Sequence, residues 1–428
     1  KLIFTAMKTQ ILSLFLILTV ILQSNAQTAE PGTELKKSPF QFSIFIPPLG
    51  TNGMYFYNTI NDFSFNTFIG AGAATNFCEL NGFMGFDRYY ADGLQASGFA
   101  SVVGFGADAQ EYSSEGVQLS GFLNANGNSY TGVQMAGFAN VNNRFQGLQL
   151  SGFLNANRNA EKAMMYAGFL NVNNVVDKTV ELAGFANISF KGTSIAQLSG
   201  FGNVAQDVKG VQGSGFFNVA RDIQGVQGAG FINVARKVRG VQASGFINIC
   251  DSIDGIPVGV ISIVLKNGYR NFEVSTSEWS PVQLTYRMGV EKFYNIYTLS
   301  KLDGTWDRYA LGFGFGHNRQ IFKKTDLNIE LVNHREIVVQ PDVFRIFHER
   351  ENNLSQLKIG IRRNLFSNIW LNVGPTLNMS WAYQLNGFAS QGEDLQPYLW
   401  EVEPKTSTNY PHWNSRFWVG FHAGVSIF

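Results

Sequence analysis

A unit of about fifteen residues repeats roughly eleven times between Gly93 and Leu265. Its clearest copies, Gly210–Ala220, Gly225–Ala235 and Gly240–Cys250, share the pattern Gly-Val-Gln-x-(Ser/Ala)-Gly-Phe-x-Asn. The second glycine recurs every 15 or 16 residues, at positions 121, 137, 152, 168, 184, 200, 215, 230 and 245. A repeat of such constant length restricts the architecture of a chain far more than it restricts the chemistry.

Within each unit, apolar residues and glycines alternate with mostly polar residues. In one copy, Val211, Gly213 and Val219 stand at odd positions after the leading glycine, whereas Gln212 and Asn218 stand at even positions. Side chains of a β-strand point alternately to opposite faces, so this period of two predicts strands. The recurring Phe falls on the same parity as Asn and Gln, which places it on the polar face.

Two architectures can use this unit. A ten-residue strand is roughly 33 Å long and a five-residue linker reaches only about 17 Å, so the linker cannot return the chain to start a parallel strand. We therefore expect an antiparallel up-and-down meander with one strand per repeat. If the Ser-Gly or Ala-Gly pair instead forms a corner, each unit becomes one coil of a parallel β-solenoid, in which the recurring Asn and Phe stack as ladders.

The C-terminal third, residues 266–428, has long alternating strands. The last one sets Phe417, Val419 and Phe421 against Gly420 and His422, and it ends at Phe428. Long or polar connections at 300–307, 341–353 and 385–414 alternate with mostly tight ones. Apolar residues outward, polar residues or glycine inward and alternating loop lengths are typical of an outer-membrane β-barrel. We expect the repeats to close with these strands into one barrel; the alternative is a solenoid beside a smaller C-terminal barrel.

The N-terminal segment predicts export. From Met7, the expected natural start, Lys8 precedes the apolar run 11–22, and Ser24–Ala26 resembles a cleavage site. We divide the chain into a signal-peptide region (1–26), a lead with the first strands (27–92), the β-repeats (93–265) and the barrel strands (266–428). The predicted location is the outer membrane of a Gram-negative cell.

Composition narrows the partners. The chain has 428 residues, 15% of them charged, and a net charge of +1. A nucleic-acid partner requires a basic face, so we expect none. Two cysteines, Cys78 and Cys250, are too few for a disulfide scaffold. Small buried side chains or a single long-range bridge between them remain open.

Motifs that carry chemistry are scarce. Gly312–Gly316 and Gly70–Asn76 resemble phosphate-binding loops only superficially, because no helix follows either of them. Asp251–Gly255 fits an Asx-type turn better than a calcium site. The histidines, at positions 317, 334, 348, 412 and 422, lack metal-ligand spacing. We therefore predict no catalytic, cofactor-binding or metal site, no cofactor and no enzymatic activity.

Two weaker hypotheses concern the predicted barrel. A hydrolase could assemble His422 with a serine such as Ser380 from another strand, because catalytic triads are spatial. A second set of residues could line a lumen and favour anions, or could be rim charge: Arg287, Lys358, Arg362 and Arg363.

The terminal strand ending at Phe428 resembles the closing strand of Gram-negative outer-membrane barrels. The repeat unit resembles uncharacterised bacterial surface-repeat proteins found in Bacteroidota-type and spirochaete genomes. These resemblances imply a location and no chemistry: contact with outer-membrane lipid, and with the barrel-assembly machinery through the strand that ends at Phe428. The predicted role is structural or surface interaction with an unknown extracellular ligand. A passive or weakly selective pore is the alternative, and a membrane-embedded hydrolase is a lesser one.

Overall fold

The computed structural model describes residues 35–105, 111–302, 308–338, 352–366, 368–384, 400–402 and 412–427. The predicted signal peptide and Phe428 lie outside the described residues. The chain forms two compact units, Lys1–Ile223 and Gln224–Phe428. The described part is built from β-strands, with two short 3-10 helices, η1 (Pro47–Leu49) and η2 (Gly53–Asn58), between the first two strands.

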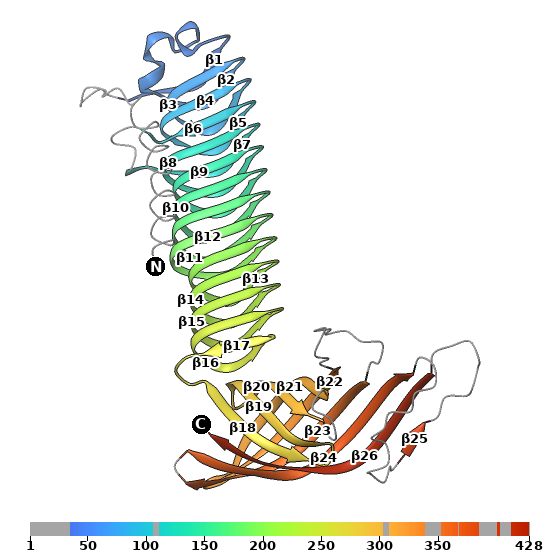
Figure 1. Ribbon diagram of the computed structural model, residues 1–428. Helices are drawn as coiled ribbons and strands as arrows, with labels where there is room; N and C mark the ends of the chain where they lie inside the picture. Colours follow the sequence, from blue (N-terminus) through green and yellow to red (C-terminus); the bar gives the residue numbers. More distant parts are fainter. Residues whose placement is uncertain are drawn as a thin grey trace. The chain divides into compact units, whose positions relative to one another are not determined.

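Seventeen strands form one parallel sheet wound into a β-solenoid of about 13 turns (Figure 1). They are β1 (Lys36–Ser43), β2 (Thr59–Asn66), β3 (Ile69–Asn81), β4 (Met84–Ala91), β5 (Gly93–Ser97), β6 (Ala100–Val103), β7 (Ser113–Ser120), β8 (Leu123–Ala136), β9 (Ala139–Ser151), β10 (Leu154–Ala167), β11 (Leu170–Ala183), β12 (Ala186–Ser199), β13 (Gly202–Ser214), β14 (Phe217–Ala229), β15 (Ile232–Ser244), β16 (Ile247–Val258) and β17 (Ile261–Val264). Equivalent repeat positions lie in register, as in Asn155 beside Asn171 and Asn171 beside Asn187.

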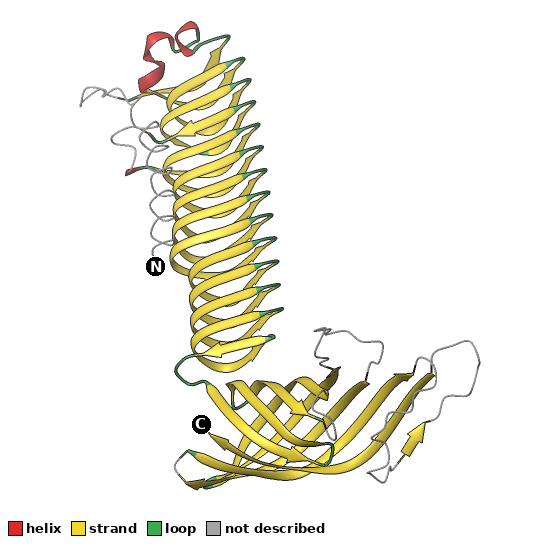
Figure 2. Ribbon diagram, in the orientation of Figure 1, coloured by secondary structure: helices red, strands yellow, loops and turns green. Residues whose placement is uncertain are grey.

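The predicted antiparallel meander is therefore wrong, and so is the single barrel that was to include the repeats. The meander followed from treating ten residues of the unit as one straight strand. In the structure, the chain bends at the Gly-Phe pair of each repeat, for example at Gly137 and Phe138 between β8 and β9. Figure 2 shows short loops between successive strands of the solenoid. Because each repeat closes one coil, the chain reaches the next parallel strand without a long return connection.

Glycine is required at this corner by the close stacking of successive coils. A Cβ atom added to Gly137, Gly152 or Gly168 would lie 2.0–2.1 Å from the carbonyl oxygen of the equivalent glycine one coil earlier. The leading glycine of the unit is needed for a different reason, since Gly132 and Gly147 have φ angles of 143° and 124°. Such backbone conformations are readily adopted only by glycine.

The solenoid interior combines ladders of amide side chains with buried apolar residues such as Phe145 and Met165. Asn124, Asn140 and Asn155 are fully buried, and each donates a hydrogen bond to the side-chain oxygen of the next asparagine in the ladder. From Asn124 to Asn218 these bonds measure 2.8–3.0 Å. The second amide hydrogen of Asn140 goes to the backbone oxygen of Leu150. The ladder that the solenoid alternative predicted is thus present, and it satisfies buried polar groups that would otherwise be costly.

The recurring phenylalanines stack on the outside of the solenoid. In the first unit their ring centroids are 4.7–5.3 Å apart from Phe68 through Phe216. Phe138 and Phe153 are 39% and 40% exposed. Parity placed Phe on the polar face, but the corner turns its side chain outward, because two consecutive residues at a bend can both point away from the interior.

Eight antiparallel strands of the second unit form a small barrel. They are β18 (Tyr269–Ser277), β19 (Ser280–Val290), β20 (Phe293–Lys301), β21 (Arg308–Phe322), β22 (Thr325–Val338), β23 (Asn352–Phe366), β24 (Ile369–Gln384) and β26 (His412–Ile427). Pairing of β18 with β26 closes the barrel, and the short β25 (Trp400–Val402) pairs with β26. A β-barrel in the C-terminal third is confirmed.

Within the described residues, no helix is both long enough and apolar enough to cross a membrane.

Candidate functional site

The barrel has a polar interior and an apolar exterior. Along β18, Asn271, Glu273 and Ser275 are buried, whereas Phe272 and Val274 are 45% and 48% exposed. Successive side chains of a strand point to opposite faces, so the same alternation runs around the barrel. Fully or almost fully buried polar residues come from six further strands: Gln283 and Arg287 (β19), Thr298 (β20), Asn328, Glu330 and His334 (β22), Gln356, Lys358 and Arg362 (β23), Asn372 (β24), and His422 and Ser426 (β26).

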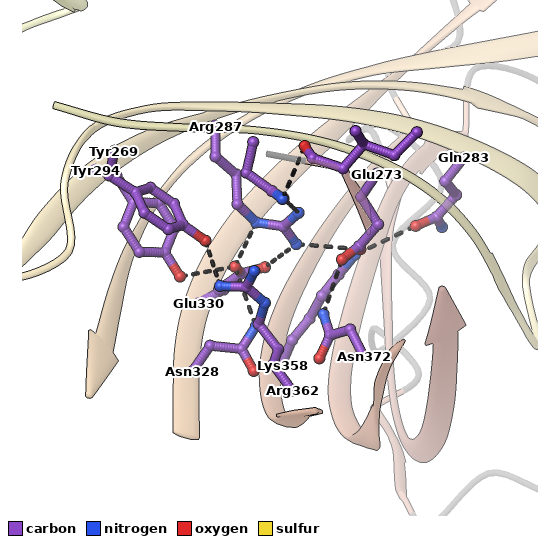
Figure 3. A network of polar contacts seen from close by, with 12 residues as sticks. Tyr269, Glu273, Gln283, Arg287, Tyr294, Asn328, Glu330, Lys358, Arg362 and Asn372 are labelled. Carbon is purple, nitrogen blue, oxygen red and sulfur yellow. Dashed lines mark hydrogen bonds and ion pairs between the residues drawn. The ribbon is translucent and has the colours of Figure 1, made fainter. Parts of the chain in front are cut away.

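Arg287 is the centre of this interior (Figure 3). Its Nε and Nη2 donate to the two carboxylate oxygens of Glu330 at 2.7 and 2.9 Å, and Nη2 also lies 3.1 Å from Glu273 Oε1. Its Nη1 donates to Asn271 at 3.0 Å. Arginine, whose planar fork fits a carboxylate in a bidentate fashion, is the cation suited to such a pair. The guanidinium is completely buried and is compensated by two carboxylates.

Further hydrogen bonds tie distant strands together across the interior (Figure 3). Tyr294 donates to Glu330 at 2.8 Å, and Asn372 donates to Glu273 at 3.0 Å. Lys358 donates to the side-chain oxygen of Gln283 at 3.2 Å. These bonds join β18, β19, β20, β22, β23 and β24. The network therefore connects strands around the barrel through polar groups in its interior.

A second cluster surrounds Glu278, in the turn between β18 and β19. Its carboxylate accepts from Asn378 at 2.6 Å, from the Trp418 indole at 3.1 Å and from the backbone N–H of Phe421 at 2.9 Å. The sequence did not predict this position of Glu278, because acidic residues are common in exposed turns. The hydrogen bonds of Glu278 hold the turn against β24 and β26.

Of the four cations considered for a lumen, Arg287, Lys358 and Arg362 are buried inside the barrel, whereas Arg363 is exposed on the outer side of β23. Arg362 donates to the Tyr269 hydroxyl. Strand parity is the sequence signal that separates the three inward cations from Arg363.

The structure does not bring Ser380 and His422 together. In the β24–β26 ladder, Ser380 pairs with Arg416, and His422 pairs with Gly374. Six residues along a strand correspond to about 20 Å. Neither ring nitrogen of His422 has a hydrogen-bond partner among the described residues. His334 contacts the Thr298 hydroxyl through Nδ1 at 3.1 Å.

The glycine-rich segments lie in strands and not in phosphate-binding loops. Gly312–Gly316 belongs to β21 and Gly70–Asn76 to β3. Asp251–Gly255, expected as a turn, lies within β16. Within the described ranges, no group of three or more His, Cys, Asp or Glu residues could hold a metal ion. His348 and the side chain of His412 fall outside that description. Cys78 and Cys250 are both free, so they do not form the bridge that the sequence left open.

Two carboxylates, Glu79 and Asp87, are buried together in the first unit. The Gln95 amide donates to Glu79 at 2.6 Å and to Asp87 at 2.9 Å. Burial, together with the negative charge of Glu79, holds the pKa of the Asp87 carboxyl well above its ordinary value. This pair therefore favours a protonated Asp87.

A third buried carboxylate of the first unit, Glu181, stands between Met165 and Gln197 in a ladder of mostly glutamine side chains. It accepts hydrogen bonds of 2.7–3.2 Å from five side chains, Asn173, Thr179, Ser189, Ser194 and Gln197. Its side chain is completely buried. The donors belong to β11 and β12, so Glu181 links two successive coils.

Comparisons of the chain with family models, curated proteins and solved structures give no match.

Proposed function

We propose that the C-terminal barrel is inserted in the outer membrane and anchors the β-solenoid there, and that the protein has a structural or surface-interaction role. The observation that carries this proposal is the reversed polarity of the barrel. Charged and amide side chains are inside, and large apolar side chains are outside. A barrel in water would bury the second set and expose the first.

The apolar exterior extends around the barrel. Exposed side chains include Leu284 (38%), Leu311 (50%), Leu331 (56%), Ile361 (51%), Leu377 (51%) and Val419 (52%), from β19, β21, β22, β23, β24 and β26. Contiguous apolar surface of this extent is typical of contact with a membrane or a partner. Alternating apolar-out and polar-in strands are the pattern of transmembrane barrels.

Membrane insertion is tested by fractionation and by heat-modifiable migration in gels, which reports a folded barrel. We expect the intact chain in the outer-membrane fraction after carbonate washing. Leu377→Lys should reduce the folded, membrane-bound form, because a lysine facing lipid costs about 2–4 kcal/mol at the bilayer midplane. Val211→Lys is the control, since Val211 is similarly exposed (43%) but lies on the solenoid. Recovery of the wild-type chain in the soluble fraction would overturn the proposal.

A pore is the second candidate. Three cations are buried in the barrel interior, together with the carboxylates of Glu273 and Glu330 that compensate Arg287. The hydrogen bonds across the interior must rearrange, or leave a path between them, before solutes pass. Planar-bilayer recordings of the purified chain test this: stable single-channel steps with anion preference would favour the pore, and silence at all voltages would favour a closed anchor.

The remaining sequence-based proposals concern context. Three of them stay predictions: similarity to bacterial surface-repeat proteins, export by a signal peptide, and recognition of the strand ending at Phe428 by the barrel-assembly machinery. Deleting Phe428 tests the last of them, because the variant should accumulate before insertion while its synthesis is unchanged. Normal insertion would remove that proposed partner.

A further inference from the structure

An apolar groove runs along the outer surface of the first unit, from β1 to β12. Its volume is about 1490 Å³. One wall is a ladder of large side chains that stand at the same position of successive coils, among them Leu119, Met135, Leu150, Tyr166, Leu182 and Leu198. The floor is made of small residues such as Ser151 and Ala167, with Asn66 and Asn81 at its β2–β3 end, and the opposite side is the glycine corner.

The groove is long and has a defined end. Register connects Phe42 to Leu198 through nine successive strand pairings, which at about 4.8 Å each give roughly 43 Å. The groove is therefore longer than the hydrocarbon of one bilayer leaflet, which is about 15 Å, half of the ~30 Å core. Beyond Leu198, the wall position is occupied by Gly213, which has no side chain to continue the wall.

The surface of the groove offers little to a polar ligand. Among the described residues that line it, none is charged. The Oγ atoms of Ser120, Ser151 and Ser199 are themselves buried, so the floor presents mainly carbon atoms. The backbone N–H groups of Gly152 and Gly168 already donate to carbonyl oxygens of the preceding coil. A polar ligand would therefore lose hydrogen bonds to water without regaining them.

We propose that this groove binds the acyl chains of phospholipids. An acyl chain has no polar groups to satisfy, and it can lie along a continuous trough that is mostly apolar. Burial of hydrocarbon against this wall supplies the driving force. The inference goes beyond a structural role for the protein, and it rests on the groove alone, whether or not the barrel is inserted in a membrane.

An extended peptide fits the same surface less well. Peptides that add to β-proteins use unpaired edge strands, whose N–H and C=O groups form the new hydrogen bonds. Along the groove, the strands β7–β12 pair on both sides with neighbouring strands, so their backbone groups serve the solenoid itself. A bound peptide would have to leave its backbone polar groups unpaired against carbon.

Photolabelling of the full-length chain tests the proposal. The purified protein is reconstituted into phosphatidylethanolamine vesicles in which one palmitoyl chain carries a diazirine and an alkyne. After irradiation, labelled tryptic fragments are identified by mass spectrometry. We expect label on fragment 145–158, which contains Leu150 and Ser151, and on fragment 271–287 from the barrel.

Two matched double variants give the decisive comparison. Met135→Lys with Leu198→Lys places charges on the groove wall, at side chains that are 40% and 42% exposed. Val211→Lys with Val226→Lys introduces the same charges at side chains that are each 43% exposed and lie outside the groove. We expect labelling of fragment 145–158 to fall about tenfold in the groove variant and to be unchanged in the control.

Each outcome separates this inference from the proposed membrane anchor. Label on the barrel fragment with none on the solenoid fragments overturns the inference and supports insertion. Label on fragment 145–158 without label on the barrel supports the groove and contradicts insertion. Equal loss in both double variants, or loss in neither, overturns specific binding in the groove, and circular dichroism confirms that each variant is folded.

Discussion

Replacing Asn171 with alanine tests whether the amide ladder holds the solenoid together. Asn171 is completely buried, donates to Asn187 Oδ1 and to the Leu182 backbone oxygen, both at 2.8 Å, and accepts from Asn155 at 3.0 Å. Alanine removes these three bonds and a longer one of 3.4 Å from the Asn171 amide to the Met165 backbone oxygen. Three groups in the interior then lose their partner at this position: Asn187 Oδ1, the Leu182 backbone oxygen and one amide hydrogen of Asn155.

The size of the effect follows from those three groups. A buried polar group left unsatisfied costs about 1–3 kcal/mol, and a net hydrogen bond is worth about 0.5–1.5 kcal/mol. Asn155 keeps its second hydrogen bond, to the Tyr166 backbone oxygen. Water that enters the space left by the side chain would recover part of the loss. We therefore expect the local free energy of opening to fall by about 2–5 kcal/mol.

Hydrogen exchange measured by mass spectrometry is the suitable assay, because each coil of a solenoid contacts only its neighbours and can open locally. Protection should fall in β10, β11 and β12 and should change little in distant coils. Asn174→Ala is the matched control: it is the same substitution in the same strand, at a half-buried side chain that does not belong to the ladder of Asn155, Asn171 and Asn187. Equal protection in the two variants would refute the stabilising role of the ladder.

Three other substitutions probe the coil corner, the buried carboxylates and the barrel interior. Gly152→Ala should lower the free energy of unfolding in urea by about 1–3 kcal/mol, because the added Cβ would lie 2.1 Å from a carbonyl oxygen. Gly228→Ala is the control and should be neutral or slightly stabilising, because a Cβ there would have no atom within 4 Å. Equal effects of the two substitutions would contradict the stacking argument. Since the pKa of Asp87 is raised above its ordinary value of 3.8, the folded state binds this proton more tightly, and stability falls as pH rises from there through the folded pKa. Asp87→Asn should flatten that dependence, and an unchanged slope would remove the role of this carboxyl. Arg287→Ala leaves two buried glutamates uncompensated and should lower the free energy of unfolding by about 3–5 kcal/mol, while Arg287→Lys should lower it less. The loss is measured as a lower unfolding midpoint of the heat-modifiable barrel. An unchanged midpoint would show that the network is not stabilising.

Much of the barrel could be predicted from local pattern. In β26, the parity that set Phe417, Val419 and Phe421 against Gly420 and His422 corresponds to exposed and buried faces. The pattern sufficed because a nearly straight strand keeps its alternation from end to end. The interior network was not predictable, since the bonds of Arg287 to Glu330 and Glu273 join residues 43 and 14 positions apart whose meeting depends on barrel closure.

The sequence by itself determined that the chain is built from strands, that its repeat is 15 or 16 residues long, and which residues recur at each position. Only the tertiary structure decided between a meander and a solenoid. The alternation of Gln212, Gly213 and Ser214 is the same in a straight strand and in a strand that approaches a corner. What distinguishes them is contact between coils, where Gly215 lies so close to the carbonyl oxygen of Gly200 that a Cβ would come within 2.2 Å.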